Sequence, residues 1–86
     1  MPKFFFHVDD GTLHLDADGA DLPDIRTAKI QAIKAASEML QELSSHLWDD
    51  RVPWTMTITS ETGVMVGSLT LTATVPSGRV HYKPEE

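Results

Sequence analysis

The 86-residue chain contains no cysteine, which excludes disulfide bonds and any chemistry that uses a thiolate. Extracellular domains of this size often need disulfides because their cores are small. We therefore expect a cytoplasmic protein. The first residues carry one basic side chain, Lys3, and a short apolar run that His7 interrupts, so we do not expect a secretory signal peptide.

Basic residues are also scarce, with 7 Lys and Arg against 13 Asp and Glu and a net charge of −6. Nucleic-acid binding needs clustered basic side chains that contact phosphates. Arg26, Lys29 and Lys34 share one predicted helix, but their spacing is typical of a solvated surface. We expect no nucleic-acid partner. No apolar run approaches the length that spans a bilayer, so we expect no membrane partner either.

The first structured segment is a predicted β-hairpin that turns at Asp10-Gly11. A two-residue loop there pairs Val8 with Leu13 and Phe6 with Leu15 on one apolar face. The same register pairs His7 with His14 on the opposite face. The hairpin is therefore predicted to separate an apolar side from a polar side.

A long amphipathic helix is predicted over about residues 22 to 47. Asp21 is the expected N-cap, with Pro23 in the first turn. Pro53 prevents the helix from continuing further.

A second hairpin follows, in which apolar residues alternate with threonine from Trp54 to Thr59. Gly63 belongs to its turn, and a bulge at Gly67-Ser68 would keep the return strand facing the core. These elements predict an α+β fold of order β-β-α-β-β, with one antiparallel sheet of four strands, or five if residues 79–83 form an edge strand. The helix covers one face of this sheet.

The length fits a single domain over residues 1–86, with an ordered core at about residues 3–75 and loose residues 84–86. A domain this small is marginally stable, which favours self-association. The predicted core contains Phe4, Phe6, Val8, Leu13, Leu15, Ile25, Ile33, Leu40, Leu43, Trp54, Ile58, Leu69 and Leu71.

The opening residues 3–8, the Asp10-Gly11 turn and the Leu22-Pro23-Asp24 segment resemble a family of small, uncharacterised bacterial proteins. Its members begin with an aromatic-aromatic-His strand, followed by an acidic-Gly turn. The resemblance covers about residues 2 to 70, and the chain departs from the pattern after Leu71. It implies a fold and a bacterial setting, and it carries over no catalytic residue.

One candidate site is a metal site formed by His7, His14 and Asp16, since a cross-strand histidine pair beside a carboxylate suits Zn²⁺ or Ni²⁺. The alternative is that these are ordinary surface side chains, because three residues are no ligand motif. No cofactor is predicted, and Asp16, Asp18 and Asp21 match turn and capping roles better than a Ca²⁺ loop.

No serine lies in a nucleophile elbow and no glycine-rich phosphate loop is present, so we expect a protein that is not an enzyme. The second candidate site is the sheet face that the helix leaves open. It either stays solvated or binds a second copy, by face packing or by edge pairing. We expect a homodimeric protein-interaction module, with metal sensing as the alternative function. The predicted interaction surface consists of Phe5, Thr55, Thr57, Thr59, Thr70, Thr72 and Thr74.

Overall fold

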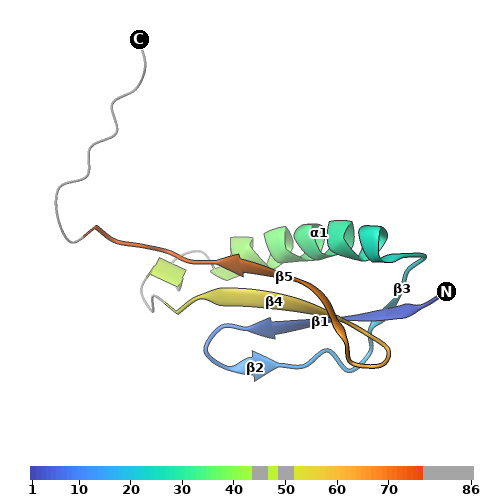
Figure 1. The fold of residues 1–86 in the computed structure, drawn as a ribbon. Coiled ribbons are helices and arrows are strands. Elements are labelled where there is room, and N and C mark those ends of the chain that lie inside the picture. The colour runs from blue at the N-terminus through green and yellow to red at the C-terminus, as the bar shows by residue number, and fades with distance from the viewer. Residues whose placement is uncertain (44–46, 49–51, 77–86) are drawn as a thin grey trace, which may run out of the picture.

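A computed structural model describes residues 1–43, 47–48 and 52–76 of the chain. It has the predicted α+β fold, in which one long helix covers a five-stranded antiparallel sheet (Figure 1). The elements are β1 (Lys3–Asp9), β2 (Leu13–His14), β3 (Ala20–Asp21), α1 (Ile25–Leu43), β4 (Trp54–Ser60) and β5 (Met65–Leu71). The fifth strand is β3, and the proposed strand at 79–83 lies outside the described residues.

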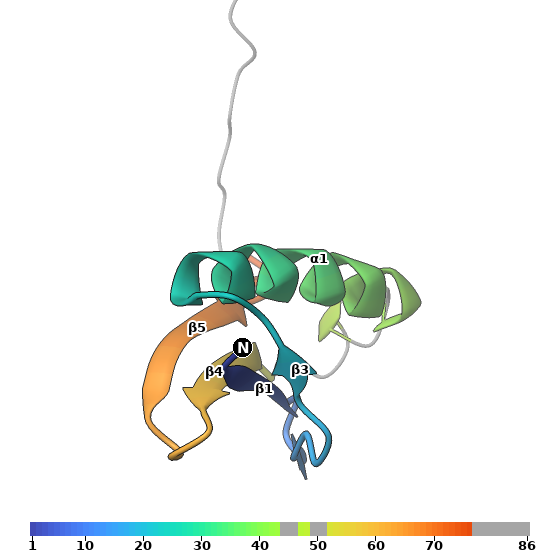
Figure 2. The ribbon, with the colours of Figure 1, turned by 90° about the vertical axis from the view of Figure 1, so that its right-hand side faces the viewer.

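The sheet has the order β2-β1-β4-β5, and β3 pairs with the first residues of β1. The long strands β1 and β4 are therefore central. Figure 2 shows α1 above one face of the sheet, with the opposite face left open. No helix in the described part of the chain is long and apolar enough to cross a membrane.

The first hairpin forms as predicted, but its register is shifted by one residue. Asp9 pairs with Leu13 and Val8 pairs with His14, so the loop has three residues, Asp10 to Thr12. Two aspartate side chains stabilise this longer loop: Asp9 Oδ1 accepts from the Gly11 N–H at 2.9 Å, and Asp10 Oδ1 accepts from the Thr12 N–H at 3.2 Å. Because a one-residue shift reverses the two faces of a strand, the predicted pairing of His7 with His14 is wrong.

Helix α1 begins three residues later than predicted, because Asp21 belongs to β3 and the Leu22 N–H donates to the Pro2 carbonyl. The N-cap is Asp24 instead of Asp21. Asp24 Oδ1 accepts from the Thr27 N–H at 2.7 Å, and this hydrogen bond lowers the pKa of the Asp24 carboxyl. The helix is described as far as Leu43, and residues 44–46 lie outside the described range.

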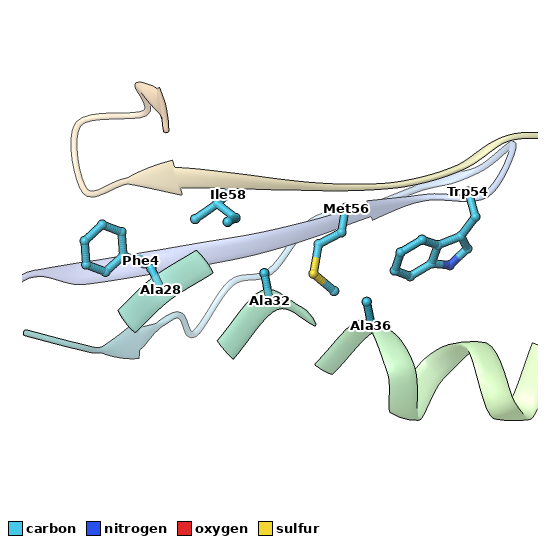
Figure 3. Close-up of a cluster of buried hydrophobic side chains, with 7 residues drawn as sticks. All are labelled: Phe4, Ala28, Ala32, Ala36, Trp54, Met56 and Ile58. Atoms are coloured by element: carbon cyan, nitrogen blue, oxygen red, sulfur yellow. The ribbon is translucent and has the colours of Figure 1, made fainter. Parts of the chain in front are cut away.

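The core lies between α1 and the two central strands (Figure 3). Ala28, Ala32 and Ala36 form one buried line along α1. Alanine has little volume, so this line lets the helix lie close to the sheet. The buried partners on the strands are Phe4, Trp54, Met56 and Ile58.

The predicted core is correct for Phe4, Trp54 and Ile58, while Phe6, Val8, Leu40 and Leu69 are partly buried against it. Leu13 and Leu15 are 59% and 71% exposed because of the shifted hairpin register. Three further residues that were predicted in the core are exposed at its margins: Ile25, Ile33 and Leu71. The side chain of Leu43 lies outside the described part.

The second hairpin turns at Ser60 to Val64, where Gly63 has a φ of 83°. Its register shifts where Ile58 pairs with Gly67 and Thr59 pairs with Met65, so Val66 is the extra residue. The predicted bulge is therefore present, one residue earlier than expected. It keeps Leu69 on the helix side of the sheet, opposite Met56.

Candidate functional site

His7 is half-buried on the open face of β1, and both of its ring nitrogens have partners. Nδ1 accepts the Asp16 backbone N–H at 3.1 Å, and Nε2 lies 3.0 Å from Thr59 Oγ1. Since Nδ1 accepts, the neutral ring carries its proton on Nε2 and donates it to the hydroxyl. The ring also stacks on Phe5, with ring centroids 6.3 Å apart. His7 therefore holds two segments of the chain together.

Asp16 organises the loop between β2 and β3. Its carboxylate accepts backbone N–H groups from Phe6, Asp18 and Gly19, each at 3.1 Å. Burial opposes ionisation, but the three hydrogen bonds outweigh it and lower the pKa of the Asp16 carboxyl below the ordinary aspartate value. All of these partners lie within the fold, so Asp16 has a structural role.

The third member of the predicted metal site lies elsewhere. His14 is exposed beside the first loop, with Nε2 3.3 Å from Asp10 Oδ1, and it faces Val8 across the sheet. The hairpin register thus separates His14 from His7, although it leaves His7 next to Asp16. Among the described residues, no group of three His, Asp or Glu side chains is arranged to hold a metal ion.

We expect Asp16→Ala to lower the free energy of unfolding by about 2 kcal/mol, because three amides lose a charged acceptor. A pKa that is lower in the folded state than in the unfolded state stabilises the protein above the unfolded value. That contribution is lost as the pH falls through the folded pKa. The difference in the free energy of unfolding between wild type and variant, measured by urea denaturation, should therefore become smaller below about pH 4.

Asp18→Ala is the matched control, because Asp18 is exposed and is only two residues away. We expect it to change the free energy of unfolding by less than about 0.5 kcal/mol. Equal effects of the two substitutions at pH 7 would show that the three amide hydrogen bonds of Asp16 do not hold the loop.

The open face of the sheet unites five of the seven residues predicted to form an interaction surface. Three cross-strand rows define it: Phe5, Thr59 and Met65; His7, Thr57 and Ser68; Asp9, Thr55 and Thr70. The hydroxyls of Thr55 and Thr70 lie 3.3 Å apart. The other two predicted residues, Thr72 and Thr74, are exposed in the segment beyond β5. Sequence reasoning missed Met65 because the bulge moves it onto this face.

Among the residues that the structure describes, strand β5 is the outermost strand on its side of the sheet, with β4 as its neighbour on the inner side. No residue from Val64 to Pro76 is charged, although 23% of the chain is charged. Natural edge strands commonly carry lysine or proline, which discourage pairing with another strand. Met65–Leu71 contains neither lysine nor proline, and the bulge is the one feature within it that discourages such pairing.

The helix side of β5 is bordered by apolar residues of α1. Ile33 lines a cleft of about 260 Å³ together with Leu69, Leu71 and Trp54. Ile30 and Ile33, about one turn apart on α1, are each 61% exposed. A wider cleft of about 840 Å³ lies at the other end of β5, between Val66 and Ile25. The free edge therefore has apolar surface along its helix side.

The family model for a domain of unknown function, DUF6894, matches residues 3–72. The chain belongs to this family. No curated protein and no solved structure matches it.

The DUF6894 match begins at the first residue of β1 and ends one residue after β5. The His7–Asp16 cluster, the open face and the free edge of β5 therefore all lie within the family domain. Thr74 lies beyond it.

Proposed function

We propose that this DUF6894 protein is a small, cytoplasmic interaction module that assembles as a homodimer and catalyses no reaction. The observation that carries the proposal is the edge of β5, a seven-residue strand with no charged side chain, bordered by exposed isoleucines. Such an edge offers backbone N–H and C=O groups to another strand, and a charge-free edge is prone to such pairing.

The size of the domain supports self-association as well. An 86-residue chain buries a smaller fraction of its surface than a larger domain, and within the described part of the chain the buried core consists of seven residues, three of them alanine. The exposed apolar side chains on α1 and β5 provide apolar surface that a partner can bury. Burial of that surface stabilises the fold through mass action.

The arrangement of polar groups favours binding over catalysis. His7 and Asp16 are the polar pair best placed for chemistry, and both are engaged within the fold. His7 bonds to the Asp16 N–H and to Thr59, and the Asp16 carboxylate accepts from the N–H groups of Phe6, Asp18 and Gly19. A catalytic group needs a free position toward a substrate. The pair instead connects β1 to the loop that leads into α1.

The test is the solution mass by light scattering, from micromolar to high protein concentration, with Zn²⁺ and separately with a chelator. We expect a dimer whose mass is the same in both conditions, and a melting temperature that rises with protein concentration. A monomer at every concentration would overturn the proposal. A dimer that forms with Zn²⁺ alone would replace it with metal-dependent assembly.

A further inference from the structure

We infer that the second copy binds at β5, where the two β5 strands pair antiparallel about a two-fold axis at Ser68. The two sheets then form one continuous sheet, and the two α1 helices contact each other through Ile30 and Ile33. This inference rests on the proposed homodimer and specifies its interface.

The centre of the strand suits pairing with itself. Ser68 is the middle residue of Met65–Leu71. A two-fold axis centred on Ser68 pairs Ser68 with its own copy on the open face and Gly67 with Leu69 on the helix side. Beyond these residues the bulge ends the match, because Met65 on the open face would lie opposite Leu71 on the helix side, so the pairing is confined to residues 67–69. The axis is perpendicular to the sheet, so both helices lie on one side of the continuous sheet.

The position of α1 gives the distance between the two helices. Helix α1 contacts both β4 and β5, and we therefore place its axis above the gap between these two strands, about half a strand spacing inside β5. The two-fold axis lies half a spacing outside β5. With neighbouring strands about 4.8 Å apart, the helix axes are about 10 Å apart, which is close to the 8–10 Å between packed helices.

The exposed isoleucines lie where that contact forms. Figure 2 shows the N-terminal half of α1 above β5. The Lys29 side chain passes over Gly67, within 3.4 Å of where a Cβ at that glycine would lie, and Ile33 lines the cleft with Leu69. The stretch from Lys29 to Ile33 therefore runs beside Ser68. Ile33 lies on the β5 side of the helix, and Ile30 lies farther from the sheet on the exposed side of the same turn. Each is 61% exposed and adds to an apolar contact surface.

The open face is less suited to a second copy. Its centre consists of threonine and histidine side chains, and several of them already form hydrogen bonds within the chain. A Thr-rich sheet face remains solvated at little cost. The exposed isoleucines beside the edge of β5 have no comparable partner among the described residues.

The absence of cysteine allows a direct test by single-cysteine cross-linking. In Ser68→Cys, the two thiols lie directly across the two-fold axis. Facing residues in antiparallel strands have Cα atoms about 4.5–5.5 Å apart, within the range that a disulfide spans. We expect most of this variant to become a covalent dimer under mild oxidation. Ser68 is exposed and the substitution is small, so the fold is retained.

Two reference variants separate this interface from the alternatives. Thr57→Cys lies at the centre of the open face and reports packing of one sheet face on another. Leu15 is 71% exposed near the first hairpin, so cross-linking of Leu15→Cys measures the background from random collisions between molecules. Cross-linking of Thr57→Cys above that of Ser68→Cys would overturn the edge interface in favour of the open face.

The helix contact has its own variants. We expect Ile33→Lys and Ile30→Lys each to raise the dimer dissociation constant at least about tenfold, while Leu15→Lys, with the same change of charge, leaves it unchanged. If the wild-type chain is a dimer but neither lysine variant weakens it and Ser68→Cys does not cross-link, the interface at β5 is wrong and the homodimer stands. If the wild-type chain is a monomer throughout, both fail together.

Discussion

We expect Trp54→Ala to lower the free energy of unfolding by about 4 kcal/mol, the largest effect of any single truncation in this chain. Trp54 is the largest of the fully buried side chains and begins the central strand β4. Its ring packs over Ala36 at one end of the core (Figure 3). Removal leaves a cavity beside Ala36, whose small side chain cannot fill it.

The loss expected for Trp54→Ala is large relative to the total free energy of unfolding. A domain of this length has a free energy of unfolding of about 4–13 kcal/mol, so the variant is expected to be partly unfolded at 37 °C. Urea denaturation followed by circular dichroism, at one fixed protein concentration, measures the difference. Circular dichroism is preferred because a second tryptophan, Trp48, contributes to the fluorescence.

Leu71→Ala is the matched control, since Leu71 lies directly opposite Trp54 on β5 and is 41% exposed. We expect it to cost about 1 kcal/mol, because its burial is partial. If the two variants are equally stable, the buried Trp54 ring contributes no more to the core than a partly exposed leucine, and the expected effect is wrong.

The strands that the sequence predicts well are those in which only one register buries apolar side chains. In β4, Trp54, Met56 and Ile58 alternate strictly with threonine, and all three are buried. The first hairpin lacks this constraint, because a shift of one residue still leaves apolar side chains on either face. Hydrogen bonds from the Gly11 and Thr12 N–H groups to the carboxylates of Asp9 and Asp10 accompany the longer loop, and hydrophobic periodicity does not report them.

For helix α1, the sequence predicted the helical period but not which residues are buried. Its period was predictable, but the buried line consists of three alanines while Ile30 and Ile33 face outward. A hydrophobicity scale ranks isoleucine above alanine, so it places the centre of the buried face too far around the helix. The close approach of α1 to the sheet favours small side chains at the contact. That approach depends on tertiary packing, which local sequence does not contain.

The candidate sites were also predictable only in part. The membership of five residues in the open face follows from strand alternation and was predictable. The separation of His14 from His7 depends on loop length, and the loop-organising role of Asp16 depends on a turn near Gly19. The free edge of β5 depends on strand order, which the sequence left open. The charge-free run from Val64 to Pro76 is the sequence signal that marks this edge.

We expect Gly19→Ala to be the second most damaging substitution, with a loss of about 3 kcal/mol in the free energy of unfolding. Gly19 has a φ of 70°, a conformation that costs an alanine about 1–2 kcal/mol. A Cβ there would also lie 2.9 Å from Phe5 Cε1 and from Lys3 Cγ, and 3.0 Å from the Phe4 carbonyl oxygen. The carbonyl belongs to β1 and cannot move without disturbing the pairing with β3, so overpacking adds about 1–3 kcal/mol.

Gly63→Ala separates these two contributions. Gly63 also has a positive φ, 83°, but nothing lies within 4 Å of where its Cβ would be. We therefore expect a loss of about 1–2 kcal/mol from backbone strain alone. The difference between the two variants, measured in urea, is the cost of the crowded contact between the Asp16 loop and β1. Because Asp16 accepts the Gly19 N–H, Gly19→Ala should also reduce the further loss caused by Asp16→Ala in a double-mutant cycle. Additive losses would mean that the loop keeps its hydrogen bonds around the new side chain.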